Sequence, residues 1–171
     1  MPDAQGLWEV PVTIAEWCLF GAVILYLVTL ALAKALAARE FDNAKPRDPA
    51  FYADPVRSRM LGAHVNGIET FPFFAVAVLL AEFRSAPQGW IDGLALAFLV
   101  TRILFVFAYV ADRPTLRTTL WNAGFAFNLG IFFLAGFGAR GAMIATALGL
   151  AWSIVVALIL VFGERSRQPR P

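Results

Sequence analysis

Apolar residues fill five long stretches of this chain, and most polar residues gather between them. Each stretch is long enough to cross the hydrocarbon core of a bilayer as a helix, which takes roughly 20 residues. The predicted spans cover about residues 13–37, 61–81, 90–111, 116–137 and 142–163. Prolines and glycines that end helices lie between the spans. We therefore expect an all-α integral membrane protein with a bundle of four transmembrane helices and a fifth, C-terminal one.

The composition supports this fold class and excludes several functions. Of the 171 residues, 60% are hydrophobic and 15% are charged, which does not describe a soluble domain. The net charge of +2 gives no reason to expect a nucleic-acid partner. One cysteine (Cys18) and one histidine (His64) leave no disulfide and no ligand set for a metal site. The expected surroundings are membrane lipids.

The lysines and arginines predict the orientation in the bilayer. Of the 14 basic residues, 11 lie in residues 34–59, 113–117 and 165–170, which share one side if the chain crosses five times. The positive-inside rule places that side in the cytoplasm and the N-terminus outside, in a bacterial inner (plasma) membrane. The predicted parts are an extracytoplasmic N-terminus at 1–12, a bundle at 13–138, an additional helix at 139–163 and a cytoplasmic tail at 164–171.

The second span carries polar groups in a segment of membrane length, where burying them is costly. The stretch Arg59–Phe74 contains Asn66 and Glu69 and then becomes almost entirely apolar. On a helix, Arg59, Asn66 and Glu69 lie on one face. A cation, an amide and a carboxylate on one helix face, near one membrane surface, are typical of a binding site.

The next spans add polar residues at matching depths. Arg102 is expected to form an ion pair with Glu69, which either fixes the helix register or holds a zwitterionic ligand. Tyr109, on the same face as Arg102, is read either as a ligand contact or as an interfacial anchor. Asn122 and Asn128 are expected to form hydrogen bonds between helices.

Two motifs resemble the MAPEG family, the membrane-associated proteins in eicosanoid and glutathione metabolism, which includes the microsomal glutathione transferases. The first motif is Arg59, then Ala-His-Val-Asn-Gly-Ile-Glu at residues 63–69, then Phe71-Pro72. The second motif is Arg102-Ile103, then Ala108-Tyr109 and the Arg113-Pro114 turn. The resemblance covers about residues 13–138, so the fifth span lies outside the family's four-helix pattern.

The resemblance implies a homotrimer that binds glutathione as a co-substrate between neighbouring subunits, toward the cytoplasmic side. Asn66 and Glu69 would hold the glutathione backbone, with Glu69 taking its amine, and Tyr109 would also contact it. Either Arg113 or Arg117 would stabilise the thiolate, which is the nucleophile. The predicted catalytic set is therefore Tyr109, Arg113 and Arg117. The predicted glutathione-binding set is Arg59, Asn66, Glu69, Arg102 and Tyr109.

The predicted function is that of a membrane-bound glutathione transferase or peroxidase that conjugates or reduces lipophilic electrophiles with a cytoplasmic thiol. Three departures from the family pattern motivate an alternative, a non-catalytic protein of the same fold that binds a lipid or a partner protein. Gly62 stands where catalytic members usually have arginine. Thr70 and Phe105 stand where the leukotriene-forming member has tyrosines.

Overall fold

The computed structural model describes residues 11–167, with side chains up to residue 163, and is helical almost throughout. The helices are α1 (Ile14–Leu36), α2 (Pro55–Phe83), α3 (Gln88–Val110) and α4 (Pro114–Arg167), with a 3-10 turn, η2 (Phe51–Ala53), before α2. All four α-helices are long and apolar enough to cross a membrane, which suits an integral membrane protein. The predicted N-terminal and C-terminal segments lie mostly outside the described residues.

Helix α2 begins six residues before the predicted span, at Pro55 rather than Leu61. We expected the prolines of the preceding connection, Pro55 included, to prevent a helix there. Pro55 instead occupies the first turn of α2, where its missing N–H costs no hydrogen bond. The helix then continues through Pro72 to Phe83.

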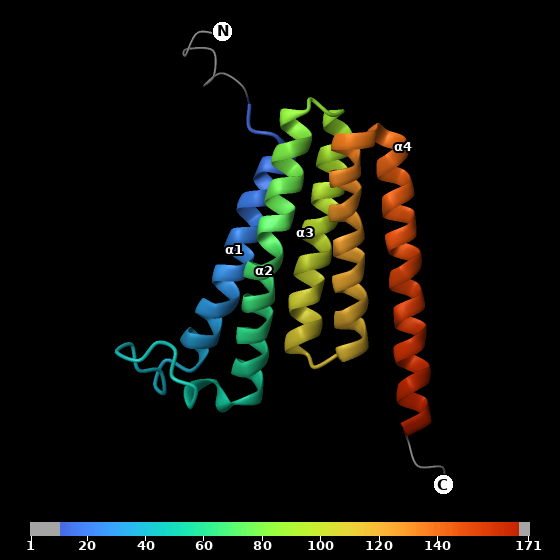
Figure 1. The fold of residues 1–171 in the computed structure, drawn as a ribbon. Helices are drawn as coiled ribbons and strands as arrows, with labels where there is room; N and C mark the ends of the chain where they lie inside the picture. The colour runs from blue at the N-terminus through green and yellow to red at the C-terminus, as the bar shows by residue number, and fades with distance from the viewer. Residues whose placement is uncertain (1–10, 168–171) are drawn as a thin grey trace.

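Helix α4 consists of two limbs that meet at Gly138. Gly138 has φ 67° and ψ −169°, a backbone conformation that only glycine adopts readily. The chain reverses there, so that the first limb (residues 114–137) and the second limb (residues 139–167) run side by side in opposite directions (Figure 1). The structure assigns the second limb to α4, and its role as a fifth membrane crossing stays a prediction.

Small side chains join the two limbs, and we call this contact the small-residue seam. The Ser153 hydroxyl donates a hydrogen bond to the Thr119 carbonyl oxygen at 2.9 Å. A Cβ atom added to Gly149 would lie 2.5 Å from the Cβ of Ala126, so the backbones approach closely at this point. Close backbone approach through glycine, alanine, serine and threonine is typical of helix pairs in membranes. The seam comprises Thr119, Ala126 and Gly130 on the first limb and Thr146, Gly149 and Ser153 on the second.

The main core lies where α1, α2, α3 and the first limb of α4 meet. Its side chains are mostly small, apart from aromatic contacts such as the stacked rings of Phe74 and Phe98, 4.0 Å apart. The outward-facing side chains are large and apolar, for example Trp17, Phe107 and Leu148. An apolar exterior around a tightly packed interior is what contact with lipid or with neighbouring subunits requires.

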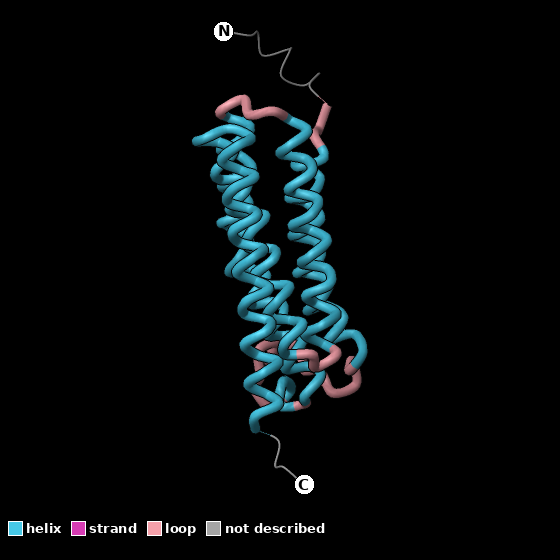
Figure 2. The backbone as a smooth tube through the Cα atoms, turned by 90° about the vertical axis from the view of Figure 1, so that its right-hand side faces the viewer, coloured by secondary structure: helices cyan, strands magenta, loops and turns pink. Residues whose placement is uncertain are grey.

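The connections lie at the two ends of the bundle, because the helices share one axis (Figure 2). Residues 37–54 and 111–113 lie at one end, together with the final turns of α4 (Figure 1). Residues 84–87 and Gly138 lie at the opposite end. The segments that carry most of the lysines and arginines therefore share one end of the molecule.

Candidate functional site

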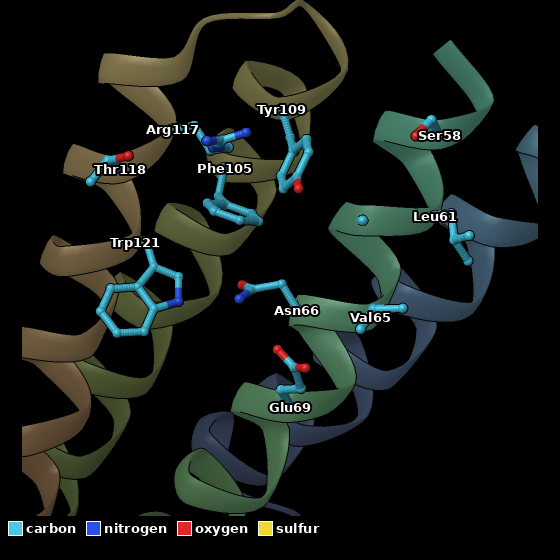
Figure 3. A pocket seen from close by; sticks show the side chains of 11 residues that line it. Ser58, Leu61, Val65, Asn66, Glu69, Phe105, Tyr109, Arg117, Thr118 and Trp121 are labelled. Atoms are coloured by element: carbon cyan, nitrogen blue, oxygen red, sulfur yellow. The ribbon is translucent and has the colours of Figure 1, made fainter. Parts of the chain in front are cut away.

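The start of α2 sets the register of the polar face. The Asp54 carboxylate accepts the backbone N–H groups of Arg57, at 2.9 Å, and of Val56, at 3.0 Å. The hydrogen bond from Arg57, followed by the one from Val56, holds the pKa of Asp54 below its usual range. This cap fixes where the helix starts, and the 3.6-residue period then brings Gly62, Asn66 and Glu69 to the side that faces α3 and α4 (Figure 3).

A cavity of about 670 Å³ lies between α2, α3 and the first limb of α4, and we call it the polar cavity. In Figure 3, the side chains of Asn66 and Glu69 extend from α2 toward Tyr109, Arg117 and Trp121. Three of the predicted glutathione-binding residues and one of the two candidate thiolate-stabilising arginines therefore meet in one place. The lining residues are Ser58, Leu61, Gly62, Val65, Asn66, Glu69, Phe105, Tyr109, Arg117, Thr118 and Trp121.

Gly62 explains how Tyr109 fits into the polar cavity. A Cβ atom at Gly62 would lie 2.6 Å from the Tyr109 hydroxyl oxygen and 3.0 Å from the ring carbon that bears it. The tyrosine therefore occupies the space into which a larger residue at position 62 would extend. The departure from the family pattern at Gly62 is thus matched by the position of Tyr109.

Arg117 reaches the cavity by stacking on the same tyrosine. Its guanidinium carbon lies 4.5 Å from the centre of the Tyr109 ring, within the range of a cation–π interaction. The edge of the Phe105 ring meets the other side of this pair, with 5.5 Å between the Phe105 and Tyr109 centroids. Aromatic contacts on two sides hold a cation in place without neutralising it.

Arg102 is buried beside the cavity, and its partner differs from the predicted one. Its side chain is 1% exposed, and its Nη2 donates a hydrogen bond to the Asn66 Oδ1 at 2.8 Å. No ion pair joins Arg102 to Glu69 among the side chains of residues 11–163, so the predicted pair is wrong. Asn66, one helical turn before Glu69, takes the guanidinium, and the Glu69 carboxylate stays exposed to the cavity.

Two further predicted residues lie outside the polar cavity. Arg59 donates from Nε to the Val110 carbonyl oxygen at 3.1 Å and lies 3.5 Å from the Asp112 carboxylate, so it ties α2 to the turn before α4. Arg113 is exposed in that turn and borders a separate surface hollow. Of the two arginines considered for the thiolate, only Arg117 lines the polar cavity.

The asparagines of the first limb also differ from expectation. Asn122 donates to the Thr118 carbonyl oxygen of its own helix, not to another helix. Asn128 is 5% exposed, and its Oδ1 has no hydrogen-bond partner within the described part of the chain. The expected hydrogen bonds between helices are therefore not formed at Asn122, nor at the oxygen of Asn128.

Sequence reasoning missed Trp121 and Thr118 as lining residues. Trp121 lies four residues after Arg117, which places both on one helix face. That spacing was the available signal, but nothing in the sequence showed which face of the first limb turns toward α2.

Comparison with known proteins identifies the family. The sequence profile of the MAPEG family matches residues 14–137, which include α1, α2, α3 and the first limb of α4. No curated protein and no solved structure matches the chain. The matched region contains both motifs and every residue that lines the polar cavity. The chain therefore belongs to the MAPEG family.

Proposed function

We propose that this protein is a membrane-bound glutathione transferase or peroxidase that conjugates or reduces lipophilic electrophiles with glutathione bound in the polar cavity. The observation that carries the proposal is the meeting of Asn66, Glu69, Tyr109 and Arg117 around one cavity. Membership of a family associated with glutathione metabolism supports it.

The polar groups of the cavity complement the groups of glutathione. The Glu69 carboxylate is exposed to the cavity and, among the described side chains, has no ion-pair partner, so it is free to accept the ammonium group. Asn66 uses its oxygen for Arg102 and keeps its NH2 group to donate to a carbonyl or carboxylate. The donor set thus fits a zwitterionic thiol peptide.

Arg117 and Tyr109 supply what the sulfur needs. A nearby cation favours the thiolate over the thiol, and the thiolate is the reactive nucleophile. The Arg117 guanidinium provides that cation, and the Tyr109 hydroxyl provides a hydrogen-bond donor beside it. Both residues hold the negative charge on sulfur until an electrophile takes the electron pair.

The proposed topology has five crossings, with the second limb of α4 as the fifth and the N-terminus outside. Eleven of 14 basic residues then lie inside, which the positive-inside rule favours. The mouth of the polar cavity lies near the turn at residues 111–113, so glutathione would enter from the cytoplasm of a bacterial cell. The exposed apolar faces of the bundle suit assembly as a homotrimer in the inner membrane.

Calorimetric titration of the detergent-solubilised protein with glutathione tests the proposal. We expect saturable binding by the wild type, and loss of binding in Glu69→Gln and in the double variant Asn66→Ala, Glu69→Ala. Glu82→Gln is the matched control, since Glu82 lies in the same helix but contacts Thr13 and Gln88 at the opposite end. A folded wild type that binds no glutathione would overturn the proposal and favour the non-catalytic alternative.

A further inference from the structure

A second cavity, of about 290 Å³, lies deeper in the bundle, where α2, α3 and the first limb of α4 meet. We call it the aromatic cavity, because Phe73, Phe98, Trp121 and Phe125 line it. Asn66, Glu69 and Trp121 line both this cavity and the polar cavity. A molecule in the aromatic cavity would therefore lie next to one in the polar cavity, with these three side chains at the boundary.

Two buried polar groups of this cavity lack partners. Arg102 is 1% exposed and Asn128 is 5% exposed, and both line the cavity. Within the described residues, the Nε of Arg102 and the Oδ1 of Asn128 have no hydrogen bond. An unpaired polar group in a membrane interior is costly, and for a charged group the cost is greater. A ligand oxygen that accepts a hydrogen bond from Arg102 would relieve it.

The rest of Arg102 is already fixed. Its Nη2 is bound to Asn66 at 2.8 Å, and its guanidinium carbon lies 4.1 Å from the centre of the Phe105 ring. These contacts hold the cation in one orientation, and Nε is left as the buried donor without a partner. The arginine is thus prepared to bind one acceptor atom and is not a mobile surface charge.

Size and charge narrow the ligand. Pockets for drug-sized molecules measure about 300–1,000 Å³, so a cavity of about 290 Å³ fits a compact molecule better than a long acyl chain. Its four aromatic walls favour a flat ring, which stacks on them. The Glu69 carboxylate also borders the cavity and disfavours an anion, so the acceptor is best supplied by a neutral carbonyl oxygen.

We propose that the aromatic cavity binds the electrophile, and that this electrophile is a compact, ring-bearing α,β-unsaturated carbonyl compound whose carbonyl oxygen accepts the hydrogen bond from Arg102 Nε. This inference rests on the proposed function, because the glutathione sulfur would come from the polar cavity. Arg117 and Trp121 are four residues apart on one helix face, so the cation for the thiolate lies one turn from the boundary between the two cavities.

The reaction at this site is an addition without a leaving group. The thiolate sulfur forms a bond to the β-carbon, and the carbon–carbon π bond breaks. Its electrons pass to the carbonyl oxygen as an enolate, which Arg102 stabilises. The proton lost by the thiol is returned to the α-carbon, so no oxidant or further reactant is needed.

The test uses the full-length protein, glutathione and three probes. An aryl enone is the predicted substrate, and an activated aryl chloride is an electrophile without a carbonyl group. The saturated ketone that corresponds to the enone cannot react and reports binding alone. We expect the ketone to bind the wild type in calorimetry and to compete with the enone. In Arg102→Lys and Asn128→Leu we expect kcat/KM for the enone and affinity for the ketone to fall about 10- to 100-fold, as for the loss of one hydrogen bond to a charged group.

The controls separate this proposal from the function proposed above. Conjugation of the aryl chloride and affinity for glutathione should change much less in Asn128→Leu, which replaces a buried amide with an apolar group of similar size. If Arg102→Lys does not fold, Asn128→Leu and the ketone titration still decide the question. Glutathione binding and aryl chloride turnover without ketone binding would overturn the aromatic cavity as the electrophile site alone. Ketone binding that depends on Asn128, with no glutathione binding, would overturn the transferase and support only a lipophile site.

Discussion

The two limbs of α4 have similar lengths and apolar compositions, but they do different work. The first limb brings Arg117, Trp121 and Asn128 to the two cavities. The second limb lines neither cavity, and residues 141–163 contain no charged residue. The family profile matches the first limb and ends just before the turn at Gly138.

The difference shows that neighbouring membrane helices can be held by chemistry or by shape. The first limb faces polar groups of α2 and α3, so its arginine and asparagine are placed for a ligand. The second limb is held through the small-residue seam, where the only hydrogen bond printed by the geometry joins Ser153 to Thr119 at 2.9 Å. Substitutions in the two limbs should therefore affect different properties.

The largest expected effect is on catalysis and lies in the first limb. Arg117→Ala removes the cation beside the sulfur, and we expect kcat/KM for conjugation to fall about 100- to 1,000-fold, as for the loss of one charge-stabilising donor. The melting temperature should change little, because Arg117 contacts only a ring at the edge of the cavity. Arg113→Ala is the control and should retain turnover, since Arg113 is outside the cavity. Equal losses in both variants would contradict the role of Arg117.

The second limb should show the reverse pattern. Gly149→Leu places a side chain against Ala126, and we expect the free energy of unfolding to fall by about 1–3 kcal/mol, the usual cost of overpacking. Thermal unfolding in detergent measures the loss, with Ala151→Leu, on an exposed position of the same limb, as the control. Glutathione affinity below the melting temperature should stay near the wild-type value. A large drop in affinity would mean that the second limb also shapes the site.

A smaller effect is expected where α2 faces the first limb. Gly62→Ala would force the Tyr109 ring to shift, and the stacked Arg117 would move with it. We expect the Kd for glutathione to rise about 3- to 10-fold, which corresponds to roughly 1 kcal/mol. Gly93→Ala is the matched control, since no atom lies within 4 Å of a Cβ at that position. Unchanged affinity in Gly62→Ala would show that Tyr109 does not contact the thiol peptide.

The smallest effect is expected at Asp54, which neither limb contacts. Its pKa is lowered in the folded protein, so its carboxylate stabilises the fold above the unfolded pKa of about 3.9. That contribution is lost as the pH falls through the lower folded pKa. Compared with Asp54→Asn, the wild type should have a slightly higher melting temperature at pH 7, and the difference should disappear in strong acid. A difference that is constant with pH would point to a cause other than this carboxylate.

Much of this architecture could be predicted from the sequence. Hydropathy located the crossings, and the helical period placed Asn66 and Glu69 together on α2. The partner of Arg102 could not be predicted in the same way, because Asn66 and Glu69 are one turn apart and only the packed geometry decides between them. The start of α2 was missed because Pro55 was read as a helix breaker, although proline also suits the first turn of a helix. The small-residue seam was missed because alanine, glycine and serine carry no strong periodic signal.

The reversal at Gly138 decides in which compartment the end of α4 emerges. The chain turns back there, so a reporter joined after Arg167 would face the same side as residues 37–54 and 111–113. A reporter placed within the turn at Gly138 would face the opposite side. Because other residues adopt this backbone conformation only with strain, one glycine without a side chain fixes the address of everything that follows it.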